Sequence, residues 1–132
     1  MHRLILSFIF SFILGLSQQL FAQDNYQQWV FDITNRLNNT EQLIKENKID
    51  DAKTEVQMAY FEVFENLEGP IRINFSAQKS YQMEATFGEI RKMISEGKPM
   101  SEIQAKIEGL KKELQEVLPS LIEGHQLNAD GQ

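Results

Sequence analysis

Residues 52–69 read AKTEVQMAYFEVFENLEG and are followed directly by Pro70, and this stretch decides which fold the chain can adopt. Its apolar side chains recur at steps of three and four residues, a spacing that places them along one side of an α-helix. The members of this apolar face, starting just before the stretch, are Ile49, Ala52, Val56, Ala59, Tyr60, Val63 and Leu67. A helix with one continuous apolar face buries that face against other elements of the fold.

Two phenylalanines of the same helix lie off this face. A helical wheel places Phe61 and Phe64 beside Glu65 and Glu68 rather than among the apolar side chains. We therefore expect the helix to have neighbours on more than one side, and Phe61 and Phe64 are candidate contacts for a partner protein. Tyr60 is expected in the core, although its hydroxyl can also donate to a buried carboxylate.

The proline after this stretch predicts where the helix ends. Pro70 has no backbone amide to donate and its ring clashes with the preceding turn, so we expect the helix to end near Gly69. Residues 71–75 (IRINF) alternate in hydropathy like a strand, but the rest of the chain offers no second strand to pair with them. We therefore expect an extended elbow, with Ser76 capping the next helix.

Three further segments repeat the helical spacing, at residues 26–47, 76–94 and 101–121. Their apolar stripes are Trp29, Ile33, Leu37, Thr40 and Ile44; Ser80, Met83, Phe87, Ile90 and Ile94; and Ile103, Ile107, Leu110, Leu114, Val117 and Leu121. Short breaks such as residues 97–99 (GKP) separate the segments. The pattern predicts an all-α, up-down antiparallel four-helix bundle.

The third predicted helix also contains Tyr81 and Gly88. Tyr81 is expected in the core because it lies at helical spacing within an apolar segment. Gly88 is expected to cost up to about 1 kcal/mol of helix stability relative to alanine. A glycine retained there suggests that another backbone comes close.

The N-terminal residues have the pattern of a secretory signal peptide. A basic start with Arg3 precedes an almost wholly apolar run over residues 4–16, and Ala22 supplies the small residue of a cleavage site. The run is shorter than the roughly 20 residues of a membrane span, and an uncleaved anchor is the alternative. The predicted division of the chain is a signal peptide over residues 1–22, a helical bundle domain over residues 23–124 and a flexible tail or linker over residues 125–132.

Composition excludes several classes of function. The part after residue 22 loses only Arg3 from the 13 basic residues and keeps all 19 acidic ones, so its formal charge changes from −6 to −7. No basic patch remains, and nucleic acid is therefore not an expected partner. The chain has no cysteine, which excludes iron–sulfur clusters and covalently attached haem, and we expect no haem. Any metal site must use mainly oxygen ligands.

The sequence does not predict an enzyme. His125, in the predicted tail, is the only histidine after the signal segment. A serine nucleophile would need a histidine inside the fold. A carboxylate pair for acid–base work would need a pocket larger than a bundle of this size is expected to offer.

Glutamates of the central helix are the strongest functional signal. Glu62, Glu65 and Glu68 are spaced by three residues, which places neighbouring carboxylates within about one helical turn. Like charges at this distance repel unless a proton or a cation lies between them. Facing helices of bundles build oxygen-rich iron sites from such glutamates, usually with histidines. The alternative is that these carboxylates are solvated on an exposed face.

Glu84 of the third helix is a further candidate, because small and hydroxylated neighbours leave room for its carboxylate to point inward. Its position along the bundle argues against a joint site, however. If the helices pack antiparallel about Gly69, Glu84 lies close to the level of Val56. The expected arrangement therefore does not bring Glu84 onto Glu65 or Glu68. A structural ion pair with an arginine of its own helix, two turns away, is the alternative role for Glu84.

The residues of two helices also resemble a known family. The run YFEVFENLEGPIR (residues 60–72), followed by KSYQMEATFGEIRK (residues 79–92), is similar to the extracytoplasmic N-terminal domain of bacterial high-affinity iron permeases of the Ftr/EfeU type. The resemblance covers roughly residues 54–118 and rests on a helix-pair pattern rather than a catalytic signature. It departs from the family in lacking both the Arg-Glu-Gly-Leu-Glu motif and any span after the signal segment.

The resemblance implies a role in iron uptake. Glu65, Glu68 and Glu84 match family glutamates and become candidate iron contacts. The implied partners are iron itself and the permease membrane domain, which either follows Gln132 in a longer chain or is a separate subunit. The implied location is the periplasm, at the cytoplasmic membrane.

Three hypotheses about function follow from the sequence. The first is a periplasmic accessory domain that binds or presents iron through helix-borne glutamates. The second is a metal-independent helical interaction module of the cell envelope, docking through Phe61 and Phe64. The third is an envelope chaperone or ligand binder with an apolar pocket and indifference to iron.

Overall fold

The described part of the protein is entirely helical. The computed structural model describes residues 25–129, with side chains described through residue 124. Within this range the chain forms four helical rods and no strand. The rods are a first helix over residues 25–45, a central helix made of α2 (Ile49–Met58), the π-helical segment η1 (Ala59–Phe64) and α3 (Glu65–Asn74), then α4 (Ala77–Ser95) and α5 (Met100–Ala129). The predicted helical bundle is confirmed, whereas the predicted signal peptide lies outside the described residues.

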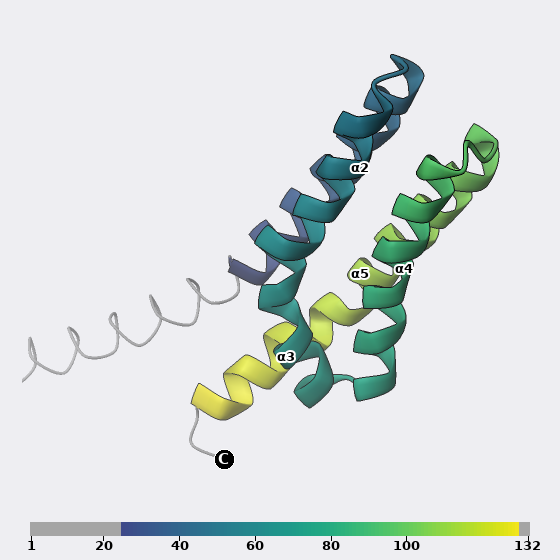
Figure 1. Ribbon diagram of the computed structural model, residues 1–132. Coiled ribbons are helices and arrows are strands. Elements are labelled where there is room, and N and C mark those ends of the chain that lie inside the picture. Colours follow the sequence, from purple (N-terminus) through teal and green to yellow (C-terminus); the bar gives the residue numbers. More distant parts are fainter. Residues whose placement is uncertain (1–24, 130–132) are drawn as a thin grey trace, which may run out of the picture.

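The rods are arranged as two helical hairpins (Figure 1). The first helix runs back along α2, and α5 runs back along α4, with the turns at residues 46–48 and 96–99 at the same end of the molecule. Helix α4 packs against both α2 and α3, and α5 also contacts α3. The central helix and α4 therefore lie side by side and share a long seam.

The predicted apolar stripes form the core. Ile33 and Leu37 of the first helix, and the α4 and α5 stripes, are buried, with Trp29 and Ile44 partly buried at its edge. Burying an aliphatic or aromatic side chain of this size contributes about 1.5–3 kcal/mol, so packing alone can hold a cysteine-free bundle together. Tyr81 is the exception, because 57% of it is exposed. The prediction that Tyr81 belongs to the core is wrong.

Local sequence explains the three reversals of the chain. Asn47 and Gly97 adopt positive φ angles of 59° and 67°, which glycine and asparagine tolerate best and which turn the chain back on itself. Ser76 is extended, and its Oγ accepts a hydrogen bond from the Lys79 amide at 3.0 Å. The predicted N-cap at Ser76 is therefore confirmed, and the elbow between the hairpins lies at Phe75 and Ser76.

Helix α3 continues through Pro70, and the predicted end at Gly69 is wrong. Residues 71–74 are helical rather than an extended elbow. A proline inside a helix costs about 3 kcal/mol. Leu67 and Ile71 lie on either side of Pro70, and both are completely buried. Because Ile71 reaches the core only when the helix continues past Pro70, the burial of these two side chains offsets the cost of the proline.

The π-helical segment changes which residues face the core. The Glu65 amide donates to the Tyr60 carbonyl, a bond that spans five residues instead of the usual four. The turn therefore contains one extra residue. The side chains that follow it point about 100° away from the direction that an uninterrupted α-helix would give them. Phe64 consequently lies in the core, completely buried, and its predicted place outside the apolar face is wrong. Asn66 donates its side-chain amide to the Glu62 and Val63 carbonyls of the widened turn, at 3.2 and 3.1 Å.

The end of α5 packs more closely than expected. The helix runs through Pro119 to Ala129 and so extends into the segment predicted as a tail. Gly124 is buried, and the side chain of Asn74 in α3 occupies the place that a Cβ at Gly124 would take. The absence of a side chain at Gly124 lets α5 approach α3.

Candidate functional site

The position of the elbow decides which glutamates meet. Because the chain reverses at Phe75 and Ser76 rather than at Gly69, residues equally far from that point lie level across the seam. Glu68 of α3 is then level with Glu84 of α4. The prediction that packing about the elbow does not bring Glu84 onto Glu68 is therefore wrong.

A single tyrosine hydroxyl joins these two carboxylates. Tyr60, on η1, has its Oη 2.6 Å from Oε1 of Glu68 and 3.2 Å from Oε1 of Glu84. Glu68 is half-buried and Glu84 is exposed. We call Tyr60, Glu68 and Glu84 the acid–tyrosine cluster. Its three residues come from three consecutive elements, η1, α3 and α4, and the widened η1 turn positions Tyr60 between the two carboxylates.

The acid–tyrosine cluster carries uncompensated negative charge. A phenol has one proton, so it donates fully to only one of the two carboxylates, and the 2.6 Å distance identifies Glu68 as the main acceptor. Within residues 25–124, neither Glu68 nor Glu84 forms an ion pair with a lysine or arginine. Burial, then the hydrogen bond and negative charge of Glu68, then Glu84, raise the pKa of Tyr60 well above its ordinary value.

The other predicted glutamate lies apart from the cluster. Glu65 is exposed and makes no hydrogen bond or ion pair in the described part of the chain. Glu62 forms an ion pair with Arg36 of the first helix at 2.8 Å. The alternative ion pair of Glu84 with Arg91 is also absent, since the described residues give Arg91 no ionic partner.

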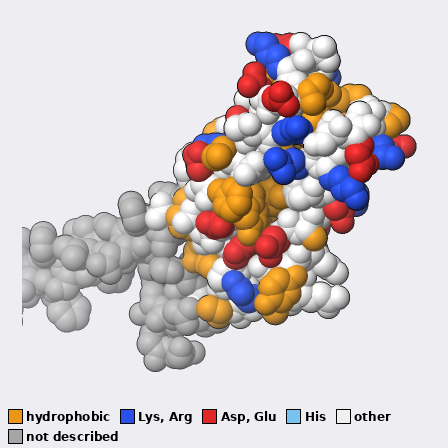
Figure 2. All heavy atoms as spheres, viewed as in Figure 1, with side chains coloured by type: hydrophobic (Ala, Val, Ile, Leu, Met, Phe, Trp, Pro, Cys, Tyr) orange, Lys and Arg blue, Asp and Glu red, His pale blue; other side chains and the backbone are white. Residues whose placement is uncertain are grey.

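A groove adjoins the cluster along the seam between the central helix and α4. It has a volume of about 290 Å³ and is lined by Val56, Gln57, Tyr60, Phe61, Glu84, Phe87, Gly88 and Arg91. We call it the aromatic groove. On the face shown in Figure 2, an apolar patch in the middle of the bundle is bordered by acidic side chains on one side and basic ones on the other.

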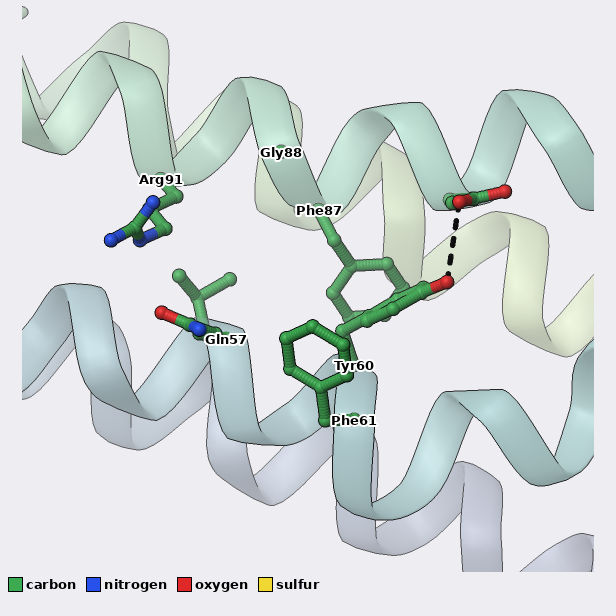
Figure 3. A pocket seen from close by; sticks show the side chains of 8 residues that line it. Gln57, Tyr60, Phe61, Phe87, Gly88 and Arg91 are labelled. Atoms are coloured by element: carbon green, nitrogen blue, oxygen red, sulfur yellow. Dashed lines mark hydrogen bonds between the residues drawn. The ribbon is translucent and has the colours of Figure 1, made fainter.

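Aromatic rings in edge-on and tilted contact build the wall of the aromatic groove (Figure 3). The ring of Phe87 descends from α4 to Tyr60, with centroids 5.7 Å apart, and Tyr60 meets Phe61 edge-on at 5.0 Å. Phe64 supports the wall from behind, 4.9 Å from Phe87. Gly88 has open space where a Cβ would stand, so no other backbone approaches it and that prediction is wrong. Its missing side chain instead leaves the groove open.

The two predicted partner-binding phenylalanines have different surroundings. Phe61 is 50% exposed at the rim of the groove, whereas Phe64 is completely buried. A completely buried side chain offers no surface to a partner, so only Phe61 is placed for contact. Sequence reasoning missed Gln57, Gly88 and Arg91 as groove residues, and the only signal available for them was the unexplained glycine.

Metal binding at these glutamates stays a prediction. No group of three or more histidine, cysteine, aspartate or glutamate side chains positioned for a metal occurs among the described residues. The structure does bring Glu68 and Glu84 together and adds the phenol oxygen of Tyr60. Carboxylate and phenolate oxygens are hard ligands of the kind that hard cations prefer.

Comparisons with known proteins do not identify a family for the chain. No protein-family model matches the sequence, no curated protein is detectably similar, and no solved structure resembles the fold closely enough to match. The resemblance to iron permease domains therefore stays a prediction. No helix in the described range has the length and apolar character to cross a membrane.

Proposed function

We propose that this protein is a non-enzymatic binding domain of the cell envelope that holds iron at the acid–tyrosine cluster and presents it to a permease membrane domain. The observation that carries the proposal is one hydroxyl shared by two carboxylates from two helices, neither of which forms an ion pair with a lysine or arginine among residues 25–124. The family resemblance supplies the choice of iron. The proposed location is the periplasm, at the cytoplasmic membrane.

The chemistry of the cluster suits a hard cation. Two carboxylates held near one another attract a cation more strongly than either would alone. Ferric iron binding to Tyr60 would displace the phenol proton, and the raised pKa of Tyr60 opposes that loss. Binding through all three side chains is therefore expected to weaken as the pH falls, because proton and metal compete for the same oxygens.

Titration of the purified protein with ferric and ferrous iron tests this proposal. The Glu68→Gln/Glu84→Gln variant should lose binding, and Tyr60→Phe should lose the visible charge-transfer band of phenolate-bound ferric iron. Glu102→Gln/Glu123→Gln is the matched control, because it removes the same charge from two exposed side chains that lie outside the cluster and are not predicted to contact iron. Equal iron binding by the two double variants would refute the assigned site.

A metal-independent interaction module is the second candidate. It is favoured by Phe61, which exposes half of its surface beside an open groove although a phenylalanine gains most from burial. Under this function, Phe61→Ala should abolish capture of the partner while the iron content of the protein stays unchanged. Retained capture by Phe61→Ala would exclude Phe61 as the docking residue.

A further inference from the structure

The aromatic groove has opposite charges at its two ends. Glu84 and Arg91 both line it from α4 and are separated by seven residues, which corresponds to about 10 Å along a helix. Figure 3 shows Arg91 at the end away from the rings and close to Gln57 of α2. Arg91 has no ionic partner within the described residues, and Glu84 takes only the longer of the two Tyr60 contacts. Both charged groups are thus available to a ligand.

The stretch between the two charges is apolar and unobstructed. The rings of Tyr60, Phe61 and Phe87 form one side, and Val56 extends the apolar surface. Gly88 leaves the middle of the groove open. A ligand that fills this stretch must have an apolar body, because a polar one would lose its hydration without gaining a partner.

We propose that the aromatic groove binds a short apolar peptide with free ends, about three residues long. Its carboxylate would pair with Arg91, its ammonium group with Glu84, and a central apolar side chain would lie against the rings. Three extended residues span about 10 Å, which matches the rise along α4 between Glu84 and Arg91. A volume of about 290 Å³ lies at the small end of ligand sites and suits a ligand of this size.

This inference goes beyond the proposed iron site and shares Tyr60 and Glu84 with it. Arg91 has no role in cation binding, so a variant at Arg91 separates the two proposals. The amide of Gln57 faces Arg91 across the groove and provides one donor and one acceptor for the peptide backbone.

Calorimetric titration with the tripeptide Ala-Phe-Ala tests the proposal. We expect the intact protein to bind it, and an acetylated or an amidated version to bind about tenfold more weakly, because each lacks one of the two charges. Arg91→Gln should weaken binding of the free peptide by a similar factor, leave the affinity for the amidated peptide unchanged, and leave iron binding unaltered. Absence of binding by the intact protein, or equal affinity for free and doubly capped peptides, would overturn the proposal. Equal affinity would instead indicate docking of an internal segment of a partner.

Filling the groove provides an independent test. Gly88→Leu places a side chain into open space and should abolish peptide binding while the thermal unfolding of the protein stays cooperative. Gly109→Leu on α5 is the matched control, because Gly109 is also a helical glycine with open space around it but lies outside the groove. Unchanged peptide binding by Gly88→Leu would overturn the proposed location.

Discussion

Lys79 and Glu84 lie five residues apart on α4, and each belongs to a group with two carboxylates. Lys79 faces α5, where its Nζ lies 3.1 Å from Glu113 and 2.9 Å from Glu116. We call these three residues the lysine cluster. Glu84 faces the central helix, where it and Glu68 share the neutral hydroxyl of Tyr60. One pair of acids therefore has a lysine between its members, and the other pair has no ionic partner in the described part of the chain.

The difference indicates what each group is for. The lysine cluster holds one positive charge between two negative ones, so Lys79 offsets half of the acidic charge; its side chain is only 16% exposed, and it joins α4 to α5 as a structural element. The acid–tyrosine cluster leaves negative charge beside an open groove, an arrangement that costs stability unless something binds there. Its geometry is maintained by aromatic packing around Phe64 rather than by charge.

Removing the aromatic support should give the largest effect. Phe64→Ala deletes a completely buried ring next to Tyr60 and Phe87, and we expect a loss of about 3–5 kcal/mol in the free energy of unfolding. Urea denaturation followed by circular dichroism measures it. Phe61→Ala, at a half-exposed position three residues away, should stay within about 0.5 kcal/mol. Similar losses in both variants would show that packing does not distinguish the two positions.

The sequence was sufficient to predict the helices and most of the core. Apolar spacing is a local property, and it correctly identified Ile33, Met83 and Leu114 as buried. The Ser76 cap was also predictable, because capping depends on a side chain and an amide three residues apart.

The site was less predictable because it depends on one extra residue in one turn. Periodicity assumes a constant 3.6 residues per turn, so it assigned Phe64 to the wrong side of the π-helical segment. The rule for proline placed the elbow six residues too early, since burial of Leu67 and Ile71 outweighs the cost of Pro70. Both errors concern tertiary packing, and together they concealed the meeting of Glu68 and Glu84.

Removing the cation of the lysine cluster should have the next largest effect. Lys79→Met leaves two neighbouring carboxylates without a partner, and we expect a loss of about 1–2 kcal/mol in the free energy of unfolding. Lys106→Met is the control, because its ion pair with Glu89, although 2.6 Å long, is about half exposed on both sides. We expect less than about 0.5 kcal/mol there. Equal losses would mean that the burial of Lys79 has no energetic consequence.

Neutralising one acid of the acid–tyrosine cluster should have a smaller effect of the opposite sign. Glu84→Gln relieves repulsion with Glu68 and retains an oxygen that can accept from Tyr60, so we expect the protein to gain up to about 1 kcal/mol at low salt. Raising the salt concentration should reduce the gain by screening. Thermal unfolding at two salt concentrations measures both. A clear loss of stability would show that Glu84 is already compensated, which would remove the contrast with the lysine cluster.

Raising the pH should give the smallest change in the free energy of unfolding, and this change tests the two clusters separately. The pKa of Tyr60 is raised, chiefly by burial and then by Glu68, and the pKa of Lys79 is raised, chiefly by its hydrogen bond to Glu116. A group whose pKa is higher in the folded state contributes its full stability below the unfolded pKa, near 10 for both side chains, and loses it as the pH rises beyond that value. We therefore expect stability to begin to fall at about pH 10 and to keep falling as the pH rises further, with less than about 1 kcal/mol of the loss due to Tyr60.

Three variants separate the contributions of the clusters to this decline. Tyr60→Phe removes one titrating group and should flatten the fall in stability above about pH 10, and Lys79→Met should flatten it independently. Glu84→Gln should lower the pKa of Tyr60, seen as earlier formation of tyrosinate in the near-ultraviolet absorbance, because one of the charges that raise it is gone. The same substitution should leave the Lys79 contribution unchanged, since Lys79 contacts only Glu113 and Glu116 among the acids. A shift in both contributions would mean that the two clusters on α4 are electrostatically coupled, and the lysine cluster would then supply part of the compensation that the acid–tyrosine cluster lacks.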